Sequence, residues 1–244
     1  MAGGGKTGGR QPRLALAGVQ RLESSVYASM KHIFIASSNP GKLRDFSAVA
    51  ARHGVNVELL PEFRSLPLCV EDGATFEDNA RKKAEHYSRH AAGQVVLADD
   101  SGIEIDALGG EPGVHSARYA AKTKTHICQI QANVGHQKSD DDENNALVLG
   151  RMKDVPEEKR TGRFVCVIAI ARDGRTIETF RGEAEGRILR ELRGTGGFGY
   201  DPMFYFPALG KTFAQLSPAE KAEVSHRGKA FAKFLEWCDA ESGF

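Results

Sequence analysis

Long apolar segments are absent from this chain. The longest apolar run, residues 164–171, is eight residues long, whereas a membrane-spanning helix needs about 20 apolar residues. The first 31 residues also lack the apolar centre of a secretory signal peptide. The sequence therefore predicts no membrane association and a cytoplasmic protein.

Cysteine is scarce, and no two cysteines form a Cys-x-x-Cys pair. The four cysteines are Cys69, Cys128, Cys166 and Cys238. Such spacing matches no zinc or redox motif, so reduced thiols in the cytoplasm are the simplest interpretation.

An excess of charge of one sign is absent as well. The chain has 33 basic and 32 acidic residues. Residues 1–31 contain five basic residues and one acidic residue, a balance of +4, which leaves 28 basic and 31 acidic residues, a balance of −3, for the rest. A slightly acidic body excludes a broad nucleic-acid-binding surface, so any polyanion must bind at a local site.

Regular structure is expected only after the first 31 residues. Residues 1–31 are rich in glycine and show no hydrophobic period, which favours a disordered extension, with Met30 as a possible start. Residues 32–240 are expected to form one domain with two lobes.

Within this domain, strands and helices alternate. Strands are expected at 32–36, 55–60, 95–98 and 103–108, with a hairpin over 164–180. Helices are expected from the turn at 37–42 to Gly54, from a near capping box at 75–78, and from a full capping box at 217–220 with a restart at Ser225. The mixture predicts an α/β fold with a mixed sheet.

Two clusters of polar residues follow predicted strands. Ser37 to Lys42 join a strand to a helix start, where amide groups and the Lys42 ammonium favour phosphate, although a plain turn with a helix cap fits too. Asp99 and Asp100 come after a buried strand and could hold Mg²⁺ or orient an attacking water, or simply form a polar turn.

Three further clusters admit both a functional and a structural interpretation. Asp78 could add a carboxylate to the metal site, or only cap its helix and pair with Lys82. The glycine-rich stretch 195–202 could stack a planar base on its aromatic residues, or pack them into the core. Lys221 and the residues 225–228 offer donors for base or phosphate oxygens, or mark a helix junction. The acidic run 140–143 is interpreted as the solvated start of a helix rather than a metal site.

These clusters occur in the order of one known family. The chain resembles the inosine triphosphate pyrophosphatases of the RdgB/HAM type over nearly all of residues 32–238. The matching stretches are residues 37–42, 75–80, 98–102, 106–110, 112–113, 116–119, 194–202 and 216–228.

The resemblance implies an elongated α/β body with a long mixed sheet, two lobes flanking a central nucleotide-binding cleft, and a homodimer. It implies Asp100 as general base and Mg²⁺ ligand, with Asp78 as the other carboxylate near the metal. The residues implied for the triphosphate and sugar are Ser37, Ser38, Asn39, Pro40, Gly41, Lys42 and Ser101. Those implied to enclose and read the base are Phe198, Gly199, Tyr200, Asp201, Lys221, His226 and Arg227.

The implied reaction is hydrolysis of ITP, dITP and XTP to the monophosphate and pyrophosphate, which would cleanse the nucleotide pool. Donors facing a 6-oxo group would reject adenine, because an amino group there would leave a donor facing a donor. The alternatives are a Maf-like pyrimidine nucleotide pyrophosphatase and a nucleotide-binding sensor without hydrolysis. The segment at about 120–137 departs from the family by its length and lacks the expected acidic start.

We predict that residues 1–30 are dispensable, because nothing in their composition indicates packing. A protein that starts at Met30 should keep its melting temperature and its activity. A large loss of either quantity would show that the extension packs or acts.

Overall fold

The computed structural model describes residues 32–53, 55–127 and 140–242. The expected N-terminal extension, residues 1–31, lies outside the described residues, as does much of the segment 120–137.

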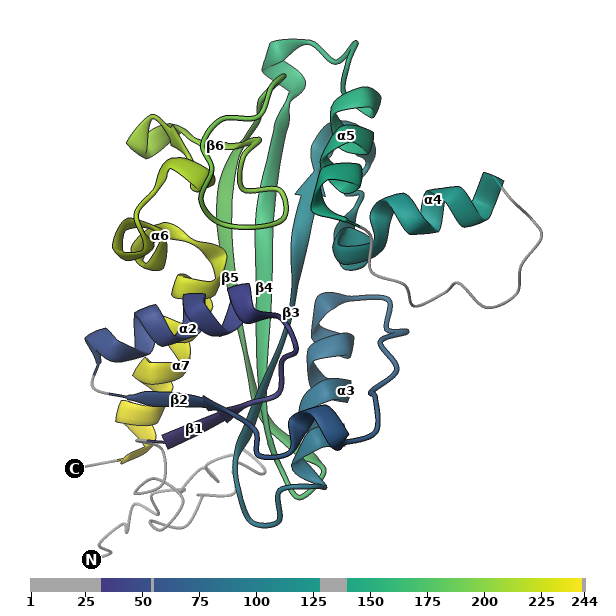
Figure 1. Cartoon of the computed structure of the whole chain (residues 1–244). Helices are drawn as coiled ribbons and strands as arrows, with labels where there is room; N and C mark the ends of the chain where they lie inside the picture. The colour runs from purple at the N-terminus through teal and green to yellow at the C-terminus, as the bar shows by residue number, and fades with distance from the viewer. Residues whose placement is uncertain (1–31, 54, 128–139, 243–244) are drawn as a thin grey trace, which may run out of the picture.

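One mixed sheet of seven strands runs through the molecule, in the order β2-β1-β3-β4-β5-β6-β7 (Figure 1). The strands are β1 (His32–Ile35), β2 (Asn56–Leu59), β3 (Val96–Ile105), β4 (Thr161–Arg172), β5 (Arg175–Ile188), β6 (Phe204–Phe206) and β7 (Lys211–Thr212). β1 pairs in parallel with β2 and β3, whereas the pairs from β3 to β7 are antiparallel. The expected α/β fold with a mixed sheet is therefore confirmed.

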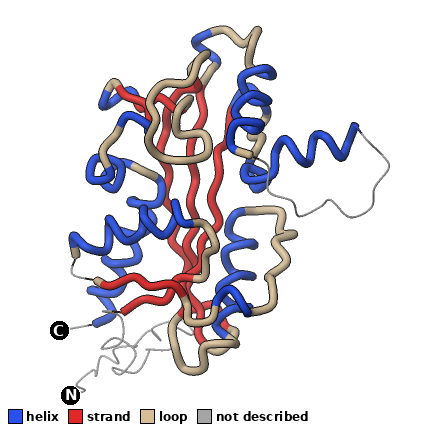
Figure 2. Tube along the Cα trace, in the orientation of Figure 1, coloured by secondary structure: helices blue, strands red, loops and turns tan. Residues whose placement is uncertain are grey.

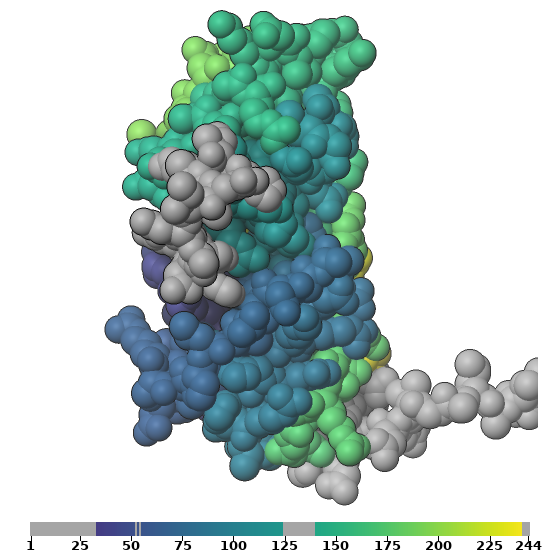
Figure 3. Space-filling model, turned by 90° about the vertical axis from the view of Figure 1, so that its right-hand side faces the viewer, coloured from purple at the N-terminus to yellow at the C-terminus, as the bar shows by residue number. Residues whose placement is uncertain are grey.

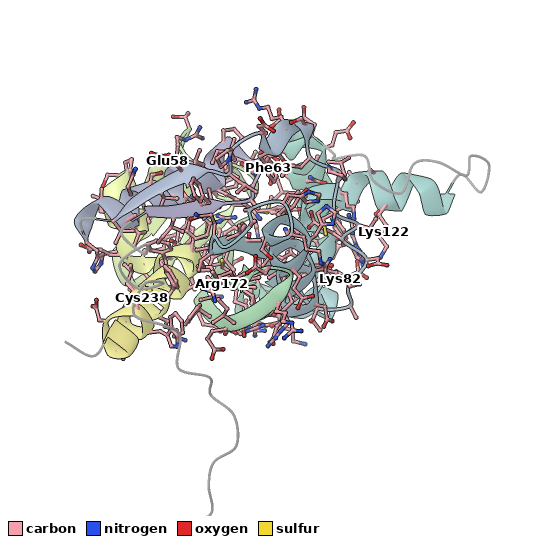
Figure 4. The ribbon with its side chains drawn as sticks, turned by 90° about the horizontal axis from the view of Figure 1, so that it is seen from below. Glu58, Phe63, Lys82, Lys122, Arg172 and Cys238 are labelled. Carbon is pink, nitrogen blue, oxygen red and sulfur yellow. The ribbon has the colours of Figure 1, made fainter. Side chains whose placement is uncertain are left out.

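Helices lie on both sides of this sheet (Figure 2). They are α2 (Pro40–Arg52), α3 (Phe76–Ser88), α4 (Tyr119–Ile127), α5 (Asp141–Arg151), α6 (Pro218–Val224) and α7 (His226–Ser242). Viewed from below, Cys238 of α7 and Lys82 of α3 lie on opposite sides of the sheet, with Arg172 of β4 between them (Figure 4). Among the described residues, no helix combines the length and apolarity that crossing a membrane requires.

The expected helix starts are confirmed. The side chain of Asn39 caps α2, Thr75 and Asp78 form a capping box on α3, and Ser217 and Glu220 form one on α6. α6 ends at Val224 with Ser225 as its C-cap, and α7 begins at His226, in agreement with the expected restart at Ser225. The acidic run also starts a helix, with Asp140 as the N-cap of α5.

The central strand β3 differs from the expectation of two short strands on either side of Asp99 and Asp100. It is one strand of ten residues, because β4 pairs with it along its whole length, from Val96 opposite Ala171 to Ile105 opposite Gly162. On its other edge, β1 pairs only with the residues opposite Phe34 and Ile35. Beyond Leu97 no strand of the described residues pairs with this edge of β3, apart from an isolated bridge between Glu104 and Pro112. The residues after β1 lie beside it: the Ala36 amide donates to the Leu97 carbonyl at 2.8 Å.

The core has three clusters. One lies between the sheet and helices α2 and α7, and a second lies between the sheet and α3. A third surrounds the far ends of β3, β4 and β5, where α5 and the segment around β6 pack. The first two clusters make one lobe and the third makes the other.

Close packing of α7 on β5 depends on Gly182. A Cβ atom at this position would overlap the His226 carbonyl and the Ala230 backbone. We predict that Gly182→Ala lowers the free energy of unfolding by about 1–3 kcal/mol, the usual cost of overpacking. Gly150→Ala is the control, because a Cβ there meets nothing within 4 Å and alanine favours the helix. Equal melting temperatures for the two variants would contradict this packing.

Candidate functional site

A cavity of about 550 Å³ lies beside the middle of β3, where the two lobes meet. Its walls come from the loop after β1, the segment before α3, one face of α3, β3 itself, and the loop that contains Phe198. Figure 3 turns the α3 side to the viewer, with α3 and the segment before it (blue) in the lower half and α5 (teal to green) in the upper half.

Adjacent residues of β3 point to opposite faces of the sheet. Asp99 and Ser101 lie on the face covered by α2 and α7, since they contact Lys42 and Arg227. Asp100 lies on the α3 face, where Asn79 and Lys83 contact it. The two carboxylates are therefore in different surroundings although they are neighbours in the chain.

The carboxylate of Asp99 is buried and forms an ion pair. Its Oδ2 lies 2.8 Å from Lys42 Nζ and accepts a hydrogen bond from Ser101 Oγ at 3.1 Å. Burial acts against the charged form, but Lys42, Lys83 and Arg227 outweigh it and hold the pKa of Asp99 below its usual value. Asp99 thus stays ionised and fixes Lys42.

Asp100 is held in the cavity wall by hydrogen bonds to both oxygens. Asn79 Nδ2 donates to Oδ2 at 3.0 Å, and the Ser101 amide donates to Oδ1 at 3.0 Å. Lys83 Nζ lies 3.8 Å from Oδ1. Burial raises the pKa of Asp100 above its usual value, although Lys83 and Lys42 oppose the shift.

Glu71 is the second carboxylate of this group. Its Oε2 lies 3.0 Å from Lys83 Nζ, so Lys83 pairs with both Glu71 and Asp100, and all three residues line the cavity. Burial opposes the charge of Lys83, but Asp100 and Glu71 raise its pKa above the usual value. The ammonium group of Lys83 therefore lies between the carboxylates of Glu71 and Asp100 on the cavity wall.

Asp78, the carboxylate that the sequence suggested, does not line the cavity. It is exposed, and its Oδ2 accepts a hydrogen bond from the Thr75 amide at 3.2 Å. The capping box directs this side chain back to the helix start, whereas the next residue, Asn79, points at Asp100. In the described part of the chain, no three His, Cys, Asp or Glu side chains are grouped as a metal site.

The loop from Ser37 to Lys42 forms another part of the wall. Asn39 Oδ1 accepts from the Gly41 amide at 2.8 Å and, at 3.4 Å, from that of Lys42, so its side chain builds the start of α2. The cavity is lined by Ser37, Ser38, Asn39, Pro40 and Lys42. Gly41 is not part of this lining: a Cβ there would lie 2.5 Å from the Phe198 ring, so Gly41 lets Phe198 pack on the loop.

Phe198 packs on two cations. Lys221 Nζ and Arg227 Cζ each lie 4.9 Å from the centre of its ring. Lys221 donates to Asp201 Oδ2 at 2.6 Å, and Arg227 donates to Asp45 at 3.1 Å and to Ser101 Oγ at 2.8 Å. Phe198 and Arg227 line the cavity, and both are fixed before any ligand binds.

Three other predicted residues contribute differently. Lys221 and His226 do not line the cavity. The His226 ring is buried against Phe164, with ring centres 4.7 Å apart, and neither of its nitrogens has a hydrogen-bond partner among the described residues. Burial, with Arg227 and Lys221, holds the pKa of His226 well below its usual value, so the ring is neutral. Tyr200 lines the cavity, but its hydroxyl donates to the Ser116 carbonyl at 2.8 Å.

Comparison with known proteins decides the family. The model of the Ham1 family matches residues 33–237. The chain belongs to the Ham1 family.

Its similar relatives in this family include a dITP/XTP pyrophosphatase of Geobacillus kaustophilus, 46% identical over 207 residues, which are 85% of this chain and 94% of the relative. A dITP/XTP pyrophosphatase of Thermus thermophilus is 43% identical over 204 residues, which are 84% of this chain and 90% of the relative. Among solved structures, the Ham1 protein of Staphylococcus aureus is similar with a TM-score of 0.69 and 38% identity, covering 86% of this chain and 99% of that one.

Some cavity residues of this Ham1 family member had no sequence signal. Glu71 stands in an irregular segment, and Asp141 belongs to an acidic run that resembles any solvated helix start. Each of these residues contacts residues that are distant in the sequence. Neither hydrophobic periodicity nor short motifs predict contacts between residues that are distant in the sequence.

The opposite surroundings of Asp99 and Asp100 predict opposite effects on stability. Asp99→Asn removes the negative charge that pairs with the Lys42 ammonium group. The substitution should therefore lower the free energy of unfolding by about 3–5 kcal/mol. Asp100→Asn removes a charge that burial disfavours, so the melting temperature should hold or rise at pH 7. Thermal unfolding of both variants checks this.

The pH dependence gives a second check on Asp99. A lowered pKa in the folded state stabilises the protein above the usual carboxyl pKa of about 4, and this contribution is lost as the pH falls through the folded-state pKa. The difference between wild type and Asp99→Asn should therefore shrink at acidic pH. A difference that stays constant from pH 7 to pH 3 would contradict the ion pair.

Proposed function

We propose that this protein hydrolyses non-standard purine nucleoside triphosphates, such as ITP, dITP and XTP, to the monophosphate and pyrophosphate. Its Ham1 relatives are named dITP/XTP pyrophosphatases, which supports this substrate class. One observation carries the proposal: a single cavity combines Asp100, the start of helix α2 with Lys42, and the ring of Phe198. Asp100 supplies a proton acceptor, the start of α2 with Lys42 supplies a phosphate site, and the Phe198 ring supplies a surface on which a planar purine can stack.

The proposed cofactor is Mg²⁺, held by Asp100 and Glu71. Mg²⁺ prefers one or two carboxylates together with water and substrate phosphates, and these two side chains flank Lys83 on the cavity wall. Glu71 replaces Asp78 in this assignment, because the Asp78 carboxylate serves its own helix cap. When bound, Mg²⁺ would neutralise charge that develops on the phosphate oxygens.

In this proposal Asp100 accepts the proton of the attacking water. Its raised pKa brings it closer to neutral pH than an ordinary carboxyl group, which favours proton acceptance. Asn79 and the Ser101 amide fix the direction of its oxygens. Lys83 and Lys42 place positive charge beside the phosphates, and the amides at the start of α2 can add hydrogen bonds.

Selection of the base is assigned first to Arg227, which lines the cavity beside Phe198. Its guanidinium can donate only, so it suits the 6-oxo group of hypoxanthine and xanthine and opposes the amino group of adenine. Lys221 and His226 lie behind this surface, where Lys221 holds Asp201 and His226 packs on Phe164.

The predicted homodimer and cytoplasmic location, and the absence of nucleic-acid and membrane partners, form part of this proposal. Cys69 and Cys166 are free thiols, as a reducing compartment requires. Gel filtration and light scattering of the purified protein check the dimer.

We predict Mg²⁺-dependent release of pyrophosphate from ITP, dITP and XTP, with ATP hydrolysed much more slowly. Chromatography of the products and a pyrophosphate assay measure both substrate choice and the bond that breaks. Equal rates on ATP and ITP would contradict the selection of the base. Phosphate as the product would contradict the bond assignment, and preference for UTP would favour the Maf-like alternative.

Carboxylate variants test the assignment of the acidic residues. Asp100→Asn should lower kcat on ITP by about 10²–10⁴-fold, because the variant loses the proton acceptor. Glu71→Gln should raise the Mg²⁺ concentration needed for half-maximal rate. Asp78→Asn is the control and should stay within about twofold of wild type, because asparagine also caps helices. A large loss in Asp78→Asn, with normal Mg²⁺ dependence in Glu71→Gln, would restore Asp78 as the ligand.

A further inference from the structure

The loop that carries Phe198 contains several residues in the left-handed region. Gly194, Gly197 and Gly199 have φ values of 86°, 73° and 62°. Glycine reaches such conformations without steric cost, and it also has the widest choice of alternatives. Phe198 stands between two of these glycines, so its position depends on what fixes the backbone on either side.

Asp201 and Lys221 fix one side of Phe198. Its amide donates to Asp201 Oδ2 at 2.9 Å, and Lys221 holds the same oxygen at 2.6 Å. The next residue, Gly199, lies outside every strand of the sheet. Its backbone groups therefore need partners from elsewhere.

Two side chains of α5 supply these partners. The Gly199 amide donates to Asp141 Oδ2 at 2.7 Å, and the Gly199 carbonyl accepts from Asn145 Nδ2 at 3.1 Å. Asp141 and Asn145 are four residues apart, so they share one face of the helix. Together they hold both polar backbone groups of one residue more than 50 positions away in the sequence.

A role in helix stability alone does not explain Asp141. An acidic residue in the first turn favours a helix, but Asp140 already caps α5 and Asp142 occupies the same turn. Asp142 is exposed, whereas Asp141 is partly buried and lines the cavity together with Gly199 and Phe198. Within this acidic run, Asp141 is the residue whose hydrogen bond to the loop is described.

We infer that Asp141 and Asn145 are positioning residues that clamp Gly199 and so hold the Phe198 ring where the nucleotide base binds. The inference rests on the proposed function, because it takes Phe198 as the base-stacking surface. The clamp acts on binding of the base and lies apart from the group around Asp100. It should therefore affect KM for the nucleotide and leave kcat nearly unchanged.

Kinetics of matched variants test this inference. Asp141→Ala and Asn145→Ala should each raise KM for ITP about three- to tenfold, the factor expected for one lost hydrogen bond, with kcat within about twofold. The inhibition constant of pyrophosphate, which has no base, should not change. Asp141→Asn should recover most of the loss, because asparagine keeps an acceptor. The control is Asp142→Ala, which removes a charge from the same turn and should match wild type.

An unchanged KM in both alanine variants would overturn the clamp. So would an equal weakening of pyrophosphate and ITP, since that is the result of a merely structural defect. If wild type does not hydrolyse ITP, the proposed function fails, and hydrogen exchange of residues 197–200 then decides the clamp separately. Faster exchange in Asp141→Ala and Asn145→Ala but not in Asp142→Ala supports it, and equal exchange in all three overturns it.

Discussion

A strand sends successive side chains to opposite faces of its sheet, and in β3 this alternation separates Asp99 from Asp100. The separation has consequences because β1 ends at Ile35, which leaves the next part of the β3 edge open to the cavity. Asp99 meets Lys42 on one face and Asp100 meets Lys83 on the other. One acidic pair in the sequence thus gives one carboxylate that pairs with Lys42 and another that lines the cavity, where we propose that it accepts a proton.

Buried charges around the cavity depend on this arrangement. Buried Asp99 and Asp201 and partly buried Asp45 each lie beside a lysine or arginine that borders the cavity or the ring of Phe198. Buried ion pairs add little net stability, but removal of one partner is costly. These pairs therefore keep cations at fixed positions in the wall before a triphosphate arrives, which lowers the reorganisation needed on binding.

Local signals predicted the helix starts, the hairpin and most of the residues that meet at the cavity. Caps and turns are encoded within a few residues, as the boxes at Thr75 and Ser217 show. The continuous strand β3 was not predictable, because only pairing with β4 carries it through two aspartates. That Glu71 lines the cavity and Asp78 does not was not predictable either, since it depends on which face of α3 meets the sheet.

The positions of the residues behind the cavity wall were not predictable from the sequence either. Gly41, Lys221 and His226 stand in motifs that indicate ligand contact, and in the structure they contact Phe198, Asp201 and Phe164. The contacts of Asp141 and Asn145 with Gly199 cross between distant segments and leave no periodic trace. The order of the motifs in the sequence indicates where the site lies. Contacts between distant segments determine which of its residues line the cavity and which lie behind it.

In the proposed function the two faces of β3 divide the acidic roles, and Asp100 and Glu71 would hold the metal on the α3 face. Binding of Mn²⁺ as a probe for Mg²⁺, followed by electron paramagnetic resonance in the absence of nucleotide, tests this most directly. Folded Asp100→Asn and Glu71→Gln should each bind Mn²⁺ at least about tenfold more weakly than wild type, since each loses one of two carboxylate ligands. Asp99→Asn should bind normally. Normal binding in the first two variants, with a loss confined to Asp99→Asn, would contradict the account.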